Sequence, residues 1–386
     1  MRAEHQLKAF EQILSSYDGS MPLHRFLPSY FKLNKQMGSS DRRWATRHIY
    51  SFFRLGKALS NLSNELRLSV ADFLCHETPG LIVNKNFPEL AEKSASNLDQ
   101  KIELIQGKYP DFKLEEVFPF HSYLSKDMDH TAFYASFFKQ PDLFIRVVDT
   151  QMKGVLADLI SAGITAEQLS STTIALPNGT KLEGVLKEGS YQVQDLSSQH
   201  TVSFFEPHKW EKWWDCCAAS GGKTLLLHSL EPNLSLLVTD LRESVLANLD
   251  ERFRLAGIKK YQKKELDLLQ NNDQSLHHYE FDGIILDAPC TGSGTWGRTP
   301  EMLTFFDPRK IGQFSAIQKG IAQNVIKYLK QDKPLIYITC SAFAAENEEV
   351  VQFMLDNLPL KLEKMELIKG YGQKADTMFV ARLIKT

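Results

Sequence analysis

The chain has 386 residues and a net charge of −2, with 43% hydrophobic and 24% charged residues. This length exceeds what one hydrophobic core usually fills, so we expect two or three domains. No apolar stretch is long enough to span a bilayer and the N-terminus lacks the apolar core of a secretion signal, which predicts a cytoplasmic protein without membrane contact. Residues 1–60 carry ten Lys/Arg against four Asp/Glu, and this basic end indicates a polyanionic partner.

The five cysteines are scattered and odd in number, and none forms the C-x-x-C pair that is typical of zinc sites. They are Cys75, Cys216, Cys217, Cys290 and Cys340. We therefore expect neither a disulfide framework nor a metal site.

The first region has helical patterns. Apolar residues recur at helical spacing over 3–17, and Ser39, Ser40 and Asp41 form an N-cap cluster that predicts a second helix. That helix carries basic residues and a tyrosine at spacings of four and three, which places them on one face. They are Arg43, Arg47, Tyr50, Arg54 and Lys57. A solvated helix face is the simpler interpretation, and contact with RNA phosphates is the alternative.

A small α+β module is predicted next. Residues 143–148 read as a strand and residues 152–162 as an amphipathic helix that ends at Gly163. Short strands follow near 172–176 and 191–194.

Beyond about residue 205 strand and helix patterns alternate, which predicts a parallel doubly wound sheet. The expected strands are 212–216, 234–239, 281–286 and 334–339, and the expected helices are 224–230, 242–256 and 311–329. In such sheets ligands bind beyond the carboxyl ends of the strands. Candidate site residues should therefore follow these strands.

The loop after the first of these strands reads DCCAASGGKT over residues 215–224. Small residues there allow the backbone to approach a ligand closely. The ending Gly222-Lys223-Thr224 resembles a triphosphate-binding loop, but that motif needs glycine where Cys217 stands, so we reject it.

Two aspartates follow the next two strand regions. Asp240 is placed to accept hydrogen bonds from the ribose hydroxyls of an adenosine cofactor, and Asp267 is placed to reach an adenine amino group. Each alone is a weak signal, because acids at strand ends are often helix caps. Adenosylmethionine and a dinucleotide fit these acids equally.

Two cysteines follow two further strands, in DAPCTGSG (287–294) and TCS (339–341). Buried cysteines are common fillers, but the polar, glycine-bearing surroundings favour a cleft. Carbon 5 of cytosine is a poor nucleophile, so its methylation needs a thiolate that adds at carbon 6. A second cysteine or a carboxylate is then a reasonable base, and Lys223 with the cofactor's sulfonium would favour the thiolate.

Those three motifs, in this order, resemble the RsmB/Sun-type RNA 5-methylcytosine methyltransferase family. Further similar segments are 191–199, the E-N-E run at 346–348 and the last strand at 376–383. The N-terminal helices resemble the NusB-like RNA-binding domain of the bacterial rRNA branch, and the likeness is weakest at 75–120. The resemblance implies a helical NusB-like domain (1–118), a small α+β, RRM-like module (119–205) and a Rossmann-like methyltransferase domain (206–386).

The resemblance also implies residue roles. Cys340 would be the nucleophile and Cys290 would help to release the product, with Lys223 and Asp287 near the target base. S-adenosyl-L-methionine would be the cofactor and RNA the substrate, specifically 16S rRNA, acted on by a monomer. The cofactor site would comprise Cys217, Ala218, Ala219, Ser220, Gly221, Gly222, Lys223, Asp240, Asp267 and Asp287. The expected RNA contacts are Arg43, Arg47, Arg54 and Arg298.

The sequence departs from the family pattern at two places. Ser220 replaces the usual proline of the cofactor loop, although serine is small enough that we expect cofactor binding to survive. The stretch after residues 298–301 lacks the usual lysine-tryptophan pair, which leaves the substrate contacts there open.

Three alternatives remain. A DNA cytosine methyltransferase would use the Pro289-Cys290 pair and leave Cys340 idle. A small-molecule methyltransferase would give no purpose to about 200 preceding residues. A non-catalytic RNA-binding assembly factor would not need both cysteines.

Overall fold

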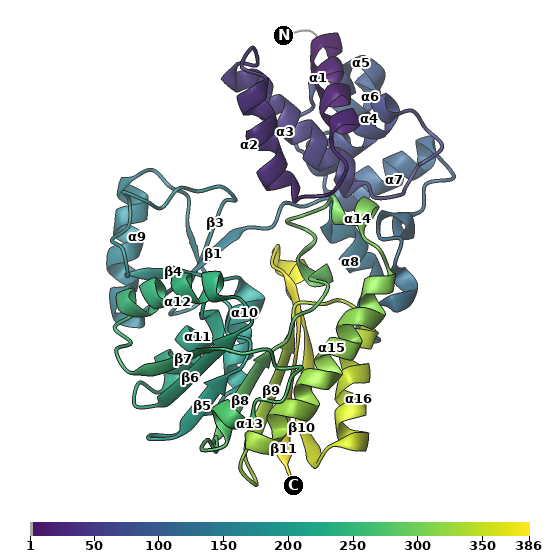
Figure 1. The fold of residues 1–386 in the computed structure, drawn as a ribbon. Helices are drawn as coiled ribbons and strands as arrows, with labels where there is room; N and C mark the ends of the chain where they lie inside the picture. The colour runs from purple at the N-terminus through teal and green to yellow at the C-terminus, as the bar shows by residue number, and fades with distance from the viewer. Residues whose placement is uncertain (1–2) are drawn as a thin grey trace. The chain divides into compact units, whose positions relative to one another are not determined.

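The computed structural model describes residues 3–386 and divides into two compact units (Figure 1). The helical unit contains residues 1–122, 129–140 and 295–307, and the sheet unit contains 123–128, 141–294 and 308–386. The chain therefore passes between the units several times. The division into three domains that we expected from the sequence stays a prediction.

The helical unit confirms the predicted helical character of the N-terminal region. Its helices are α1 (Ala3–Ser16), α2 (Leu23–Leu33), α3 (Ser39–Arg54), α4 (Asn64–Cys75), α5 (Leu81–Asn86), α6 (Pro88–Ala91), α7 (Leu98–Lys108), α8 (His130–Ser136) and α14 (Met302–Phe305). Phe10, Ile13, Ile49 and Phe53 lie in the core that α1 and α3 share.

Two details at the start of this unit correct the sequence analysis. Helix α2 was missed, because Pro28 lies inside it and its N-cap, Pro22, makes no side-chain capping bond. The Leu23 N–H is instead bonded by the carboxylate of Glu301, which is 278 residues away. Helix α3 has Gly38 at its N-cap, and Asp41 accepts the Gly38 N–H at 2.9 Å.

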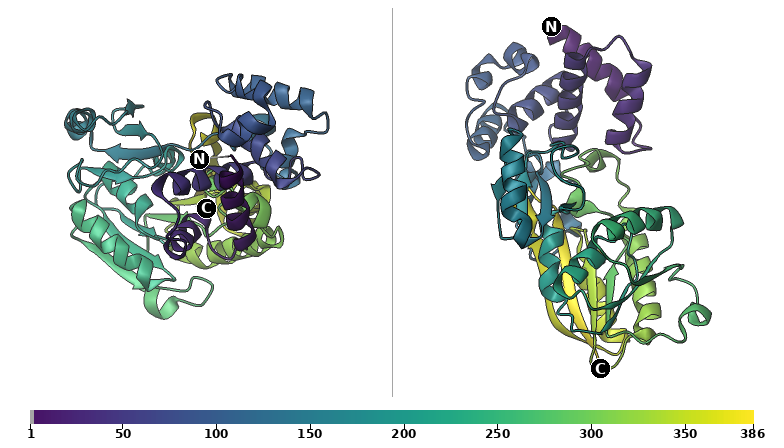
Figure 2. Two further views of the ribbon diagram at one scale, coloured as in Figure 1. Left: turned by 90° about the horizontal axis from the view of Figure 1, so that it is seen from above. Right: turned by 90° about the vertical axis from the view of Figure 1, so that its left-hand side faces the viewer.

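The segment 295–307 packs into the helical unit, although it follows a strand of the sheet unit (Figures 1 and 2). The Phe305 ring lies 5.4 Å from Tyr17 and 5.8 Å from Phe53. Trp296 is buried against Phe118, with 5.7 Å between ring centroids. The helical core therefore depends on residues from a distant part of the chain.

The sheet unit contains a seven-stranded sheet in the order β10-β11-β9-β8-β5-β6-β7. The parallel strands are β5 (Lys212–Asp215), β6 (Ser235–Asp240), β7 (Tyr261–Glu265), β8 (Gly283–Asp287) and β9 (Pro334–Thr339). β10 (Leu360–Lys369) and β11 (Thr377–Lys385) add an antiparallel edge. The sheet confirms the predicted Rossmann-like class, with strand ends within two residues of those expected.

Chain order explains why the site lies near β5. From β5 the chain steps outward through β6 to β7, and from β8 it steps the other way to β9, so the order reverses between β5 and β8. Right-handed crossovers then place α11 (Gly222–Leu230) and α12 (Glu243–Leu255) on one face and α15 (Arg309–Val325) on the other. Core residues of α11 and α12 pack together with the sheet, among them Leu226, Leu249 and Phe253.

The small module has an antiparallel sheet in the order β2-β3-β1-β4. Its strands are β1 (Leu143–Val147), β2 (Glu167–Gln168), β3 (Thr173–Leu176) and β4 (Tyr191–Val193), and α9 (Met152–Ser161) covers it. Val155 and Leu159 of α9 pack on Ile145 and Ile174. The module thus contains the predicted helix and strands, together with β2, which the sequence analysis did not predict.

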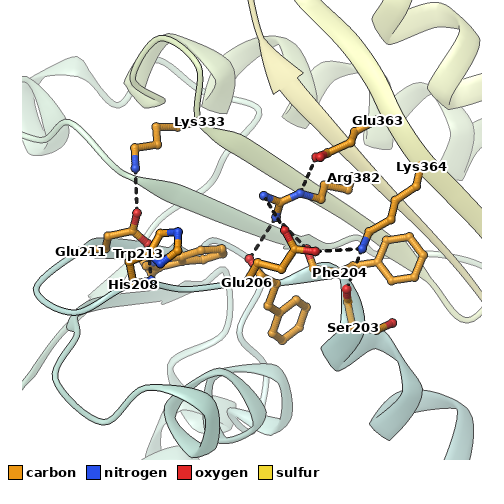
Figure 3. Close-up of polar contacts among 11 residues, drawn as sticks. Ser203, Phe204, Glu206, His208, Glu211, Trp213, Lys333, Glu363, Lys364 and Arg382 are labelled. Carbon is orange, nitrogen blue, oxygen red and sulfur yellow. Dashed lines mark hydrogen bonds and ion pairs between the residues drawn. The ribbon is translucent and has the colours of Figure 1, made fainter.

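The chain before β5 is fastened to the antiparallel edge by charged side chains (Figure 3). Arg382 on β11 donates to the carbonyls of Phe204 and Phe205 at 2.8 and 3.0 Å. The carboxylate of Glu211 accepts the Trp213 indole N–H and pairs with Lys333. These bonds join the segment before β5 to β11 and to Lys333, which directly precedes β9. Within residues 3–386, no helix combines the length and apolarity needed to cross a bilayer.

Candidate active site

The loop between β5 and α11 is held in an unusual backbone conformation. Ala219 and Gly221 have φ of 47° and 82°, in the left-handed region that favours glycine. The Ala218 N–H donates to the Thr239 carbonyl, and the Ala219 N–H donates to the Asp240 carboxylate at 3.0 Å. A Cβ on Gly221 would lie 2.5 Å from the Phe253 ring. The loop is thus fitted closely between β6 and α12.

The predicted cofactor acids follow neighbouring strands. Asp240 ends β6, is almost buried, and accepts from Ala219 and from the backbone and side chain of Arg242. Asp267 follows β7 and accepts the Leu269 N–H at 3.0 Å, a bond that a purely local turn would also make. Parallel strand ends bring both acids to the edge that carries the loop.

Lys223, at the start of α11, forms an ion pair of 3.0 Å with Asp287 at the end of β8. Its ammonium group also donates to Ser198 at 2.9 Å. The lysine is largely buried and Asp287 is partly exposed, so the Asp287 carboxylate is the more accessible member of the pair at the edge of the sheet. The two residues that the family resemblance places beside a target base are therefore in direct contact.

Asp215, at the end of β5, is buried and was not assigned a role from the sequence. One carboxylate oxygen accepts from Thr224 at 2.6 Å, and the other has no hydrogen-bond partner among the described residues. Burial, with the nearby Asp287 charge, raises the pKa of Asp215 to about 7. This carboxyl group therefore titrates near neutral pH.

The two cysteines meet, as the sequence predicts for two neighbouring strand ends. The sulfur atoms of Cys290 and Cys340 are 3.3 Å apart, just beyond β8 and β9. The hydrogen bond between the sulfurs, together with burial, raises the pKa of the Cys290 thiol well above its usual value. The two thiols are therefore close enough to share a proton.

Glu346 joins the two cysteine loops, a role that sequence analysis missed. Its carboxylate accepts from Thr291 beside Cys290 and from Ser341 beside Cys340, and Gln318 of α15 donates to it at 3.2 Å. Burial raises the pKa of Glu346. The E-N-E run was noticed in the sequence, but a carboxylate six residues after Cys340 gives no hint of its partner near Cys290.

Two further hydrogen bonds, at Gly294 and Ser293, join the loop of Cys290 to the loop of Cys340. The Gly294 N–H donates to the Cys340 carbonyl at 2.9 Å, and Ser293 accepts the Ala342 N–H at 2.8 Å. A Cβ on Gly294 would lie 2.1 Å from the Thr377 carbonyl oxygen. The spacing of the two sulfurs therefore rests on backbone bonds as well as on Glu346.

The basic stripe of α3 is corrected by the structure. Arg54 is only 3% exposed and donates to the carbonyls of Phe137, Lys139 and Gly297 and to the side chain of Gln140. Its expected place on an open RNA-binding face is wrong, because these buried acceptors need its guanidinium. Arg47 is bound to Asp72 and to the Thr78 carbonyl. Arg43 is exposed, and Arg298 is partly exposed in the segment 295–307.

The residues at the edge of the sheet fit an adenosine cofactor that carries an amino-acid group. The loop offers small residues and the N-terminus of α11, where N–H groups favour a carboxylate. A Cβ on Gly222 would meet nothing within 4 Å, so the loop opens there. Acids stand beyond β6, β7 and β8 to accept from hydroxyl, adenine amino and ammonium groups.

Comparisons with known proteins agree with this geometry. The family model described as 16S rRNA methyltransferase RsmB/F matches residues 202–384. Ribosomal RNA small subunit methyltransferase B of Citrobacter koseri is 32% identical over 173 residues, 45% of this chain and 40% of that protein. The protein of the same name from Photorhabdus laumondii is 29% identical over 265 residues, 64% and 60% of the two chains. The chain spans about half the length of the curated relatives it matches.

The fold is shared with a solved structure, NSun6 from Pyrococcus horikoshii with SFG. The TM-score is 0.58 at 19% identity, over 70% of this chain and 97% of that one. This likeness supports the fold alone. Residues 202–384 are therefore similar to the RsmB/F family of 16S rRNA methyltransferases.

Proposed function

We propose that the protein transfers a methyl group from S-adenosyl-L-methionine to carbon 5 of a cytosine in RNA, with 16S rRNA as its substrate. The observation that carries the proposal is the pair of thiols 3.3 Å apart beside the Lys223–Asp287 ion pair. The names of the relatives support the substrate class, and the loop at the start of α11 with the acids Asp240 and Asp287 supports the cofactor class.

The cofactor loop and three acids have the binding roles. The backbone of 217–223 would hold the amino-acid end at the start of α11, Asp240 would hold the ribose, and Asp267 the adenine amino group. Bound there, the cofactor supplies an electrophilic methyl group on sulfur. Asp287, paired with Lys223, lies between the loop and the cysteines, where it would orient both the cofactor and the base.

Cys340 would act as the nucleophile. Its thiolate adds to carbon 6 of the cytosine, and the electron pair moves to carbon 5, which bonds to the methyl carbon while the methyl–sulfur bond breaks. A base then takes the proton from carbon 5, and the Cys340–carbon 6 bond breaks to release 5-methylcytosine. The family resemblance of the T-C-S motif supports Cys340 as the nucleophile, and the 3.3 Å between the two sulfurs supports Cys290 as the partner that exchanges a proton during release.

The remaining expectations belong to the same proposal. Residues 1–118 would bind RNA as a NusB-like domain and 119–205 as an RRM-like module, with 206–386 as the catalytic domain. Arg43 and Arg298 would contact RNA, and the protein would act as a monomer in the cytoplasm. Arg47 would contact RNA only through the part of its side chain that the ion pair with Asp72 leaves exposed.

The DNA-enzyme alternative assigns the attack to Cys290, and a denaturing gel separates the two assignments. With labelled RNA and cofactor, Cys340→Ala should form no protein–RNA adduct, whereas Cys290→Ala should accumulate a covalent complex because release stalls. Cys75→Ala, in the helical unit, is the matched control and should turn over normally. An adduct that persists in Cys340→Ala and vanishes in Cys290→Ala would overturn our assignment. No methyl transfer by the wild type would favour the assembly-factor alternative.

A further inference from the structure

Ser220 is the residue at which the cofactor loop departs from the family pattern, and the structure gives it a partner. Arg252, on α12, donates one guanidinium nitrogen to both the carbonyl and the hydroxyl of Ser220, at 3.0 and 2.8 Å. The two residues are 32 positions apart in the chain. No motif of the sequence analysis includes Arg252.

The other two nitrogens of Arg252 bind a second element. They donate to the side-chain oxygen of Gln192 on β4, at 3.3 and 3.1 Å. Arg252 therefore ties Ser220 to both α12 and β4. A planar guanidinium can hold both sides at once, whereas a single ammonium group cannot.

The surroundings of the loop explain why such a tie matters. Gly221 packs against Phe253 and Leu249 of α12. The same helix therefore contacts the loop at Gly221 and binds Ser220 through Arg252. Ala219 and Gly221, on either side of Ser220, are both in the left-handed region. Proline restricts its own φ, and serine does not. A loop with serine here needs an outside contact to stay in one conformation.

We infer that Arg252 is a positioning residue for the cofactor loop, acting through Ser220 to keep 219–222 in the shape that binds the cofactor. It replaces, by hydrogen bonds from α12, the stiffness that a proline would give. This inference rests on the proposed function, because the loop's ligand is taken to be S-adenosyl-L-methionine.

The test is calorimetry of S-adenosyl-L-methionine binding to the full chain. Arg252→Met keeps the apolar stem and removes the donors, and we expect about tenfold weaker binding, about 1.4 kcal/mol. The kcat at saturating cofactor should change little, because the cysteines are untouched. Arg254→Met, on the same helix but exposed and paired with Glu251, is the matched control and should bind like the wild type.

Substitutions at Ser220 make the test specific. Ser220→Pro should restore most of the affinity in the Arg252→Met background, which a merely destabilised helix would not allow. Ser220→Ala should weaken binding two- to threefold alone and add little to Arg252→Met, since both changes remove the same bond. Ser220→Ala alone leaves Arg252 in place, so it keeps the inference testable if Arg252→Met does not fold.

The outcomes separate the inference from the proposed function. If the wild type binds no S-adenosyl-L-methionine, both fall together. If the wild type binds and Arg252→Met binds equally well, only the inference is overturned. Equal losses in the Ser220→Pro background and in the parent would also overturn it, because the effect would then not pass through Ser220.

Discussion

The sheet unit and the helical unit carry similar charged residues but use them differently. In the sheet unit, Asp240, Asp287 and Lys223 gather where the parallel strands end, at the edge where ligands bind. In the helical unit, Arg54 and Arg47 point into the protein and bind carbonyl groups and Asp72. Topology brings strand ends to a common edge, whereas helical spacing says only which residues share a face and not whether that face is covered.

The comparison predicts the largest effect at Arg54. Arg54→Met should lower the free energy of unfolding of the helical unit by about 3 kcal/mol, because it leaves buried carbonyl groups without donors. Hydrogen exchange of α3 and α8 measures this locally. The exposed Arg43→Met is the control, and similar exchange in both variants would mean that Arg54 is not a structural residue.

The next effect tests the sheet unit. Asp240→Ala should weaken S-adenosyl-L-methionine binding about 100-fold, roughly 2.7 kcal/mol, because it removes the ribose acceptor and the bond to Ala219. Calorimetry measures the change, with Asp250→Ala on the exposed side of α12 as control. Unchanged affinity would remove Asp240 from the site.

Asp215 is the exception within the sheet unit, a buried acid that we expect to act on stability. Its folded-state pKa of about 7 lies above the usual 3.8, so the folded protein loses stability as pH rises from about 4 to 7. Asp215→Asn should therefore be more stable than the wild type above pH 7 and no more stable near pH 4. Thermal unfolding across this range checks it, and a difference independent of pH would contradict the charge argument.

Arg43 is the exception within the helical unit, and the smallest effect is expected there. Arg43→Glu should weaken RNA binding a few-fold and reduce its salt dependence by the equivalent of about one phosphate contact. Binding measured at several salt concentrations tests this, and Lys361→Glu on β10 is the control. If the two variants behave alike, Arg43 belongs to a solvated face.

The sequence predicted the sheet unit well for a physical reason. Strands β5, β6, β8 and β9 have apolar runs that end at polar residues, so the edge that carries Asp240, Cys290 and Cys340 follows from chain order. The meeting of the two sulfurs also follows, because β8 and β9 are neighbours. These inferences need only local patterns and the rules of parallel sheets.

Other features depend on tertiary partners that local patterns do not contain. The start of α2 is bonded by Glu301, Glu346 links Thr291 to Ser341, and Arg252 holds Ser220. Each is a single side chain whose partner lies on another element. Local patterns also could not assign 295–307 to the helical unit, since its aromatic residues read as an ordinary loop between a strand and a helix.

The segment 295–307 has a consequence for the order of folding during synthesis. Most of the helical unit is made before residue 141, yet Trp296, Glu301 and Phe305 are made more than 150 residues after its α8. At the usual rates of translation this interval is roughly ten to thirty seconds. During this interval Tyr17 and Phe53 lack their contact with Phe305, and Phe118 lacks its contact with Trp296. The N-terminal helices therefore stay incompletely packed until residues 295–307 have been made.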